Sequence, residues 1–202
     1  MQMVTIRQRI LKIVYPLLMG FTRLIGKNKG VMLNEGSVEP RNSLYDLSVQ
    51  LINGEEMKLI EFKGNKILFV NTASDCGYTD QYEDLKKLNE QAGNKLKIIA
   101  FPANDFKAQE KRSDKDIELF CKMQYGINFP MAKKSVVIKN TNQNKVYQWL
   151  TDKTKNGWNN QQPRWNFSKY LVNENGLLTH YFDASVSPLS DEVMLAVNEK
   201  IK

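Results

Sequence analysis

The residues of this chain best suited to covalent chemistry are Cys76 and Cys121, its two cysteines, and His180, its single histidine. A structural zinc site needs about four Cys or His ligands and a catalytic site about three, so this inventory argues against a bound metal. Histidine catalysis would depend wholly on His180, which lies in an expected strand and is more simply a surface or half-buried side chain. The remaining chemistry is that of a cysteine that uses neither a metal nor an organic cofactor.

Cys76 lies where an apolar segment ends and a helical pattern begins. Residues 66–71 are almost continuously apolar, as expected for a strand covered on both faces, and residues 74–77 lead from this strand into the helix. At such a position, unpaired backbone N–H groups and the positive end of the helix dipole favour a thiolate, which is a nucleophile. A buried cysteine that acts as a small hydrophobic side chain is the alternative.

The elements that would position Cys76 alternate between strand and helix. Asn53-Gly54 and Asn175-Gly176 mark two hairpin turns, because these residue types tolerate positive φ. We expect hairpin strands at residues 44–49, 56–60, 170–172 and 177–182, further strands at 97–101 and 135–139, a helix carrying Tyr82, Leu85 and Leu88, a helix capped by Ser113 and Asp116, a helical segment at 146–150 and a closing helix at 189–201. This order predicts an α/β domain with a thioredoxin-like fold, in which helices flank a central mixed sheet.

Four sequence blocks add a more specific signal. They are NTASDCGYTDQY at residues 71–82, FPANDF with Gln109-Glu110 at 101–110, FCKMQYG with FPM at 120–131, and RWNFSKYLV at 164–172. In this order and spacing they closely resemble the motifs of the glutathione peroxidase family, in its cysteine-containing, thioredoxin-dependent type. One short motif would be weak evidence, but four in order span nearly all of residues 43–202.

The resemblance implies an enzyme that reduces hydrogen peroxide and organic or lipid hydroperoxides. Cys76 would attack the peroxide and become a sulfenic acid, while Trp165 and Asn166 match the positions that hold and polarise the reactive group. Cys121 matches the resolving cysteine, which would form a disulfide with Cys76, and this step requires local unfolding if Cys121 lies inside a helix. Core packing for Trp165 and a buried structural thiol for Cys121 are the alternatives.

The chain departs from the family pattern near this site. Asp105 stands where the family has a catalytic glutamine, Asp80 replaces a proline, and Lys111 and Arg112 replace a Pro-Gly pair at the rim of the site. An ionised Asp105 close to Cys76 would raise the pKa of its thiol, whereas a protonated or outward-turned carboxyl would do little. The first alternative predicts that Asp105→Gln increases the second-order rate with hydroperoxide.

Residues 1–27 differ in character from the rest of the chain. The composition is 42% hydrophobic and 25% charged, typical of a soluble globular protein, but most of the net charge of +7 lies in residues 1–41. The remaining domain is close to neutral and lacks the clustered Lys and Arg of a groove that follows phosphates, so we expect no nucleic-acid partner. On a helix, residues 1–27 would place Arg9, Lys12, Arg23 and Lys27 on one face, opposite an apolar face.

Such an amphipathic helix can lie on an anionic membrane surface, whereas its apolar run at residues 13–21 is too short to span a bilayer. A helix packed on the domain and a signal or signal-anchor segment are the alternatives. Residues 28–42, rich in Asn, Gly and Pro, indicate a flexible linker to the domain at 43–202. We expect a cytoplasmic protein at the membrane surface, with a signal-anchored periplasmic protein as the alternative.

Either thioredoxin or glutathione is expected to return the enzyme to its reduced state, and Cys121 favours thioredoxin. No long insertion separates Tyr147 from Trp165, where tetrameric relatives carry assembly loops, so we expect a monomer. A disulfide reductase of the thioredoxin kind is disfavoured because Thr79 stands where a CxxC motif would need its second cysteine. The competing hypothesis is a weakly catalytic, membrane-tethered redox sensor or binding module, and it depends on Asp105.

Overall fold

The computed structural model describes residues 30–199. The predicted amphipathic helix at 1–27, residues 28 and 29 of the predicted linker, and the last two residues of the predicted closing helix lie outside the described residues. None of the described helices is both long and apolar enough to cross a membrane.

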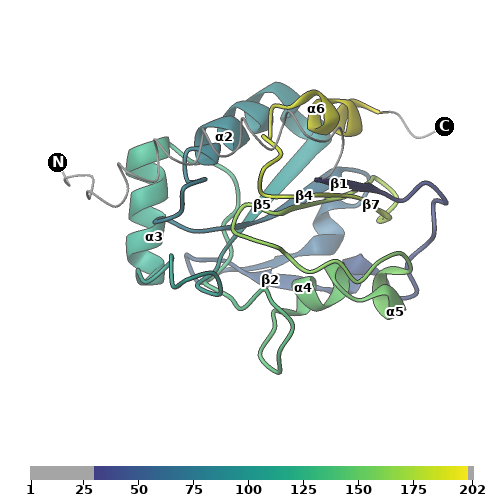
Figure 1. Cartoon of the computed structure of the whole chain (residues 1–202), viewed down its shortest axis with the longest axis horizontal. Coiled ribbons are helices and arrows are strands. Elements are labelled where there is room, and N and C mark those ends of the chain that lie inside the picture. Colours follow the sequence, from purple (N-terminus) through teal and green to yellow (C-terminus); the bar gives the residue numbers. More distant parts are fainter. Residues whose placement is uncertain (1–29, 200–202) are drawn as a thin grey trace.

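A five-stranded mixed sheet forms the middle layer of the described structure (Figure 1). Every residue of β4 (Lys66–Thr72) is buried, because other elements cover both faces of the sheet at this strand. β4 pairs in parallel with β5 (Leu96–Pro102) and antiparallel with β6 (Lys169–Val172). β7 (Leu178–Phe182) and β1 (Val31–Leu33) complete the order β1-β7-β6-β4-β5. The predicted central mixed sheet is confirmed.

Alternate side chains of β4 enter two separate cores, one on each face of the sheet. Leu68 and Val70 belong to the core that contains side chains of α2, α3 and α6, whereas Ile67 and Phe69 belong to the core that contains α4. Figure 1 shows α2 and α6 on one side of the sheet and α4 and α5 on the other. The bounds of these helices are α2 Gln81–Ala92, α3 Asp114–Phe120, α4 Lys145–Leu150, α5 Lys153–Asn156 and α6 Asp191–Asn198.

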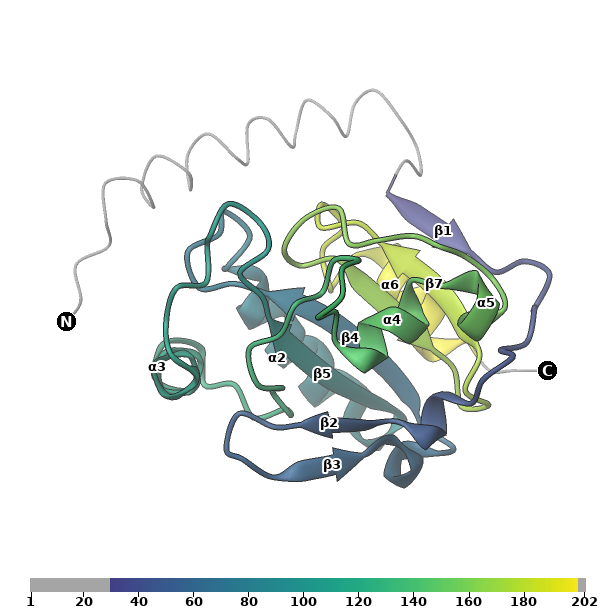
Figure 2. The same cartoon turned by 90° about the horizontal axis from the view of Figure 1, so that it is seen from below.

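Both predicted hairpins are present, but the strands of the first are shorter than predicted, because Leu44–Asp46 and Leu59–Phe62 are 3-10 helices. β2 (Ser48–Gln50) and β3 (Glu56–Lys58) form a separate two-stranded sheet near α4 (Figure 2), and Gly54 in their turn has φ +91°. The β6–β7 turn contains Gly176 at φ +82°. The shorter helical turns are the 3-10 helices Leu44–Asp46, Leu59–Phe62 and Gly93–Lys95 and the π-helix Cys121–Tyr125.

The prediction of a flexible linker is wrong for residues 31–33. They form β1, whose backbone pairs with β7 at the edge of the sheet. Val31 packs against the core of α2 and α6, and Met32 packs against the opposite core. Pairing with β7 and the packing of Val31 and Met32 on opposite faces of the sheet order this short apolar run, although Asn, Gly and Pro surround it in the sequence.

The predicted strand at 135–139 is also wrong. Its only ladder contact is a single bridge between Val136 and Gln143. The N–H groups of Val137 and Lys139 instead donate to the side chains of Asp105 and Gln162, so side chains satisfy backbone groups that a neighbouring strand would otherwise bind.

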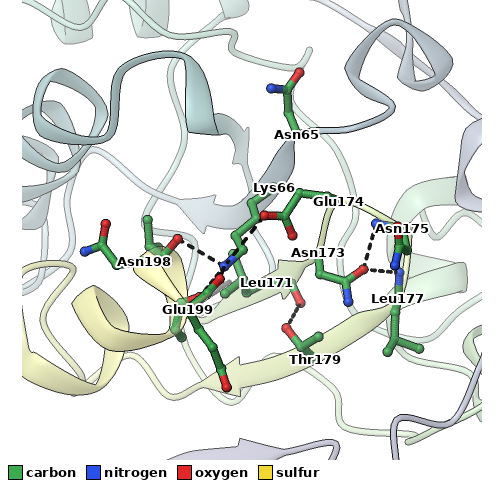
Figure 3. Close-up of polar contacts among 12 residues, drawn as sticks. Asn65, Lys66, Leu171, Asn173, Glu174, Asn175, Leu177, Thr179, Asn198 and Glu199 are labelled. Carbon is green, nitrogen blue, oxygen red and sulfur yellow. Dashed lines mark hydrogen bonds and ion pairs between the residues drawn. The ribbon is translucent and has the colours of Figure 1, made fainter. Parts of the chain in front are cut away.

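Lys66, at the start of β4, fixes the last helix onto the sheet (Figure 3). Its buried ammonium donates to the backbone carbonyls of Ala196, Val197 and Glu199 at the C-terminal end of α6, where a helix leaves its carbonyls unpaired. Glu174 lies 4.0 Å from the same ammonium. Burial lowers the pKa of Lys66, and the nearby Glu174 and Glu199 oppose that shift. The charge of Lys66 complements the negative end of the helix dipole.

Candidate active site

Cys76 lies on the loop that joins the carboxyl end of β4 to α2. Its side chain is 8% exposed, and its thiol is free. The Cys76 N–H donates to Thr79 Oγ1 at 3.1 Å, and this hydroxyl lies 3.0 Å from Ala73 O, so Thr79 fixes the turn. The Tyr78 N–H approaches Cys76 Sγ at 3.4 Å.

Burial raises the pKa of the Cys76 thiol, because the thiolate loses water. Hydrogen bonds from the Tyr78 N–H, the side chains of Trp165 and Asn166, and the Gly77 N–H lower the pKa and partly oppose this effect. The expected backbone N–H donors are present, from Gly77 and Tyr78, but they belong to the loop before the helix and do not offset the burial of the sulfur. The helix α2 begins only at Gln81, and desolvation of the sulfur outweighs its donors.

Trp165 and Asn166 reach Cys76 from the loop that precedes β6, as the motif predicted. The indole Nε1–H of Trp165 is buried and donates to no oxygen or nitrogen within residues 30–199, which leaves it available to the sulfur whose pKa it lowers. The Trp165 ring packs against Phe106 with centroids 5.6 Å apart, and its carbonyl accepts from Asn71 Nδ2 at 3.1 Å. The Phe106 ring thus packs on the indole, while Asn71 fixes the backbone that carries it.

Asn166 is completely buried, and Gln109 holds its amide. Asn166 Nδ2 donates to Gln109 Oε1 at 3.0 Å, and the backbone carbonyl of Gln109 accepts from the Asp75 N–H at 3.0 Å. Gln109 therefore contacts both the Cys76 loop and the amide beside the sulfur. Gln109 was not among the predicted site residues, although its place in the second motif was a signal for it.

Asp105 is turned away from the sulfur. Its Oδ2 accepts from the Val137 N–H at 2.7 Å, and burial raises its pKa while the N–H groups of Val137 and Ile138 lower it. The largest effects on the pKa of Cys76 come from burial and from Tyr78, Trp165, Asn166 and Gly77 rather than from Asp105. Asp105 could have been an ionised carboxylate beside Cys76 or a carboxyl turned away from it, and the bond to Val137 corresponds to the second alternative. The predicted gain in rate from Asp105→Gln has no electrostatic basis in this arrangement.

Between Asp105 and Gln109 the backbone takes an unusual course. Lys107 and Ala108 both lie in the left-handed region, with φ of 51° and 50°, which side-chain-bearing residues seldom occupy. Lys107 Nζ lies 5.6 Å from the centroid of the Trp165 ring. On one side of this turn the Asp105 side chain binds the Val137 N–H, and on the other side the Gln109 side chain binds Asn166. The turn also places the Lys107 cation beside the Trp165 ring.

Glu110 binds the loop that carries Cys76 through Ser74. Its carboxylate is fully buried and accepts from both the N–H and the hydroxyl of Ser74, each at 2.7 Å. Burial raises the pKa of Glu110, and the two bonds from Ser74 and the charge of Arg112 lower it. Glu110 thereby fixes the backbone two residues before Cys76.

Cys121 lies at the C-terminal end of α3, where the π-helix Cys121–Tyr125 begins. It is a free thiol with 1% exposure, and it belongs to the same core as Cys76. Burial raises its pKa to about 12, while the neighbouring Tyr82 hydroxyl lowers it. Since Cys121 lies in a helical segment, its pairing with Cys76 would need local unwinding.

His180 has no contact with these site residues. It stacks on Phe182 with centroids 5.3 Å apart, and its Nδ1 lies 3.0 Å from Thr179 Oγ1. Burial lowers its pKa to about 4, so it is neutral at physiological pH. Within residues 30–199, no three His, Cys, Asp or Glu side chains gather in a way that could hold a metal ion.

Comparisons with known proteins place this geometry in context. A family model described as glutathione peroxidase matches residues 44–151. The glutathione peroxidase homolog BsaA of Staphylococcus epidermidis is 40% identical over 147 residues, which cover 72% of this chain and 92% of that relative. The glutathione peroxidase-like peroxiredoxin 2 of Saccharomyces cerevisiae is 37% identical over 149 residues, covering 73% of this chain and 91% of its own length.

Solved structures show the same fold. The apo form of Trgpx has a TM-score of 0.59 at 26% identity and covers 79% of this chain and 97% of its own. A thiol:disulfide interchange protein of the thioredoxin family from Chlorobium tepidum has a TM-score of 0.56 at 12% identity, over 80% of this chain and 97% of its own, and so shows likeness of fold alone. The predicted thioredoxin-like fold is confirmed.

Proposed function

Because this chain belongs to the glutathione peroxidase family and is a thiol peroxidase, we propose that Cys76 is the residue that reduces the hydroperoxide. The observation that carries this assignment is the set of donors around its sulfur. The N–H groups of Gly77 and Tyr78 and the side chains of Trp165 and Asn166 all lower the pKa of this one thiol. Such donors steady the sulfur before the reaction and the departing oxygen during it.

In the first step, the Cys76 thiolate attacks one oxygen of the hydroperoxide, and the O–O bond breaks. The other oxygen takes a proton and leaves as an alcohol, or as water when the substrate is hydrogen peroxide. The sulfur is oxidised to a sulfenic acid and the peroxide is reduced by two electrons. Burial raises the pKa of the free thiol, and the hydrogen bonds from Tyr78, Trp165, Asn166 and Gly77 lower it, so these donors increase the fraction of thiolate that can attack.

In the second step, Cys121 resolves the sulfenic acid. The Cys121 sulfur bonds to the Cys76 sulfur, the S–O bond breaks, and the oxygen leaves as water with the thiol proton. The depth of Cys121 and its pKa of about 12 keep this thiol neutral until its segment opens and exposes it. A dithiol reductant then returns both cysteines to thiols.

We propose thioredoxin as the physiological reductant and glutathione as the competing one. An intramolecular disulfide is the natural substrate of a dithiol protein, whereas a monothiol would act directly on the sulfenic acid. The name of the yeast relative, which includes both glutathione peroxidase and peroxiredoxin, is compatible with either donor. Steady-state peroxide consumption with each donor, in the parent protein and in Cys121→Ser, tests this choice. Loss of thioredoxin-dependent turnover in the variant supports thioredoxin, and equal turnover contradicts it.

The assignment of Cys76 itself is tested by single turnover. The reduced full-length protein is mixed with one equivalent of hydrogen peroxide, and products are followed by intrinsic fluorescence and by mass spectrometry after alkylation. We expect a 76–121 disulfide in the parent, a trapped sulfenic acid in Cys121→Ser and no peroxide consumption above background in Cys76→Ser. Consumption by Cys76→Ser at the parent rate would contradict the assignment.

The hypothesis of a weakly catalytic redox sensor or binding module loses its main support. It depended on a carboxylate at Asp105 that acts on Cys76, and Asp105 binds the Val137 N–H instead. Stopped-flow measurement of peroxide consumption in the presence of a reductant decides between the two functions. A peroxidase consumes peroxide over repeated turnovers, whereas a sensor needs no turnover with a reductant.

We also propose that residues 1–27 hold the enzyme at an anionic membrane surface, where lipid hydroperoxides are its substrates, and that the enzyme works as a monomer in the cytoplasm. The support is the excess of cations in this segment and its amphipathic pattern. The test is liposome sedimentation of the full chain with Arg7, Arg9, Lys12 and Arg23 changed to Gln. Undiminished binding contradicts the proposal.

A truncation at Ser43 is unsuitable for this test because it would remove β1 from the sheet. Analytical ultracentrifugation tests the monomer.

A further inference from the structure

Arg112 touches the chain neighbours of both cysteines. Its Nη1 lies 3.1 Å from Oδ1 of Asp75, the residue directly before Cys76. The same guanidinium lies over the ring of Phe120, 4.8 Å from the centroid, and Phe120 directly precedes Cys121. One side chain therefore connects the Cys76 loop to the end of α3 that carries Cys121.

The backbone of Arg112 is anchored as well. Its carbonyl accepts from Lys134 Nζ at 2.6 Å, and the next residue, Ser113, caps α3 by accepting from the Asp116 N–H. The Arg112 side chain is only 25% exposed. Arg112 is thus fixed at the start of α3 while its guanidinium contacts the end of the same helix.

Phe120 must move when Cys121 moves, because the two are consecutive and Cys121 begins the π-helix. The Phe120 ring also packs edge-to-face on Tyr125, with centroids 5.6 Å apart. Unwinding this segment, so that Cys121 can reach oxidised Cys76, separates the Phe120 ring from the guanidinium. The Arg112 contact therefore stabilises the closed form and is lost in the open one.

We propose that Arg112 is a positioning residue that slows disulfide formation by holding the Cys121 segment closed. The proposal rests on the proposed function, because it concerns the step in which the sulfurs of Cys76 and Cys121 join and water leaves. A slower step lengthens the life of the sulfenic acid. During that time a second hydroperoxide can oxidise Cys76 to the sulfinic acid and leave as alcohol.

The charge of Arg112 also lowers the pKa of buried Cys121, which taken alone would speed resolution. This effect applies to the closed form, in which burial keeps the thiol neutral. Once the segment opens, water solvates Cys121 and the charge matters little. The packing contact between Arg112 and Phe120 thus determines whether Arg112 slows or speeds disulfide formation. Removal of Arg112 should therefore accelerate this step.

The test is single-turnover disulfide formation in the reduced full-length protein after one equivalent of hydrogen peroxide. Arg112→Gln should form the 76–121 disulfide about two- to five-fold faster, the factor that corresponds to a cation–π contact. Phe120→Leu should also accelerate the step. The double variant should be accelerated by less than the product of the two single effects, because both substitutions remove the shared contact between Arg112 and Phe120. Lys115→Gln, which removes a cation from an exposed position of α3, is the matched control and should leave the rate unchanged.

A rate in Arg112→Gln equal to or below that of the parent overturns the proposal, as does a double variant whose acceleration is the product of the two single effects. Either result leaves the proposed function intact if the parent forms the disulfide. Absence of a 76–121 disulfide in the parent would instead remove the resolving step, and this proposal with it. The sulfinic fraction under excess peroxide is a second readout, and it should be smaller in Arg112→Gln.

Discussion

The hydrogen bond between Gln109 and Asn166 allows a direct test of how the amide beside Cys76 is held. Gln109→Met keeps the length of the side chain and removes the oxygen that accepts from Asn166 Nδ2 at 3.0 Å. The buried Oδ1 of Asn166 accepts no hydrogen bond in the described part of the chain, so this bond is a principal constraint on its orientation. The variant should leave Asn166 free to turn away from the sulfur.

The expected effect follows from the strength of one buried neutral hydrogen bond. A contribution of about 0.5–1.5 kcal/mol corresponds to a fall in the second-order rate with hydrogen peroxide of about two- to twelve-fold. The pKa of Cys76 should rise further, because Asn166 is one of the donors that lower it. Gln109→Glu keeps an acceptor for Asn166 but adds negative charge, so it should raise the pKa while Asn166 stays in place.

Stopped-flow fluorescence gives the rate, and the pH dependence of alkylation by iodoacetamide gives the pKa of Cys76. The matched control is Gln143→Met, since Gln143 has the same 6% exposure as Gln109 but donates to Val137 O and Thr151 Oγ1. If Gln109→Met reacts at the parent rate with an unshifted pKa, or if Gln143→Met changes both as much, Asn166 does not depend on Gln109.

Three further predictions concern stability. Asp105→Ala removes the acceptor of the Val137 N–H, so the free energy of unfolding in urea should fall by about 1–3 kcal/mol, and an unchanged midpoint would contradict the role of this bond. His180 has a pKa of about 4 in the folded state, below its unfolded value near 6.5, so protonation favours the unfolded state. The free energy of unfolding should therefore fall by up to about 3 kcal/mol as the pH falls from 6.5 to 4. His180→Gln should remove that part of the loss, and equal pH dependence in urea titrations would refute it. Lys66→Met deprives the end of α6 of its donor, so amide hydrogen exchange in α6 should accelerate about ten-fold or more; unchanged exchange would show that Lys66 does not hold the helix.

Short-range chemistry made several elements predictable from the sequence. Asn53-Gly54 and Asn175-Gly176 placed both hairpins, and the Ser113 cap placed the start of α3, because each depends on residues two to four positions apart. The closing helix was predicted at 189–201, and α6 occupies Asp191–Asn198 within the described residues.

Elements that depend on a distant partner were not predictable in this way. Val31–Leu33 is ordered by pairing with β7 and by contacts with both cores, and neither is visible in a segment rich in Asn, Gly and Pro. Residues 135–139 have the apolar pattern of a strand, but the Asp105 carboxylate and the Gln162 amide take up their N–H groups. Ladder pairing is a property of two segments, so a single segment cannot reveal it.

Four ordered motifs and a scarcity of other reactive residues were enough to identify the family, the fold and Cys76 as the candidate nucleophile from the amino-acid order alone. Three features of the site became visible only in the folded chain: burial raises the pKa of Cys76, Asp105 accepts from the Val137 N–H, and Gln109 accepts from Asn166. Desolvation and hydrogen bonding depend on which distant segments meet around an atom, and that meeting is a property of the folded chain rather than of any local run of residues.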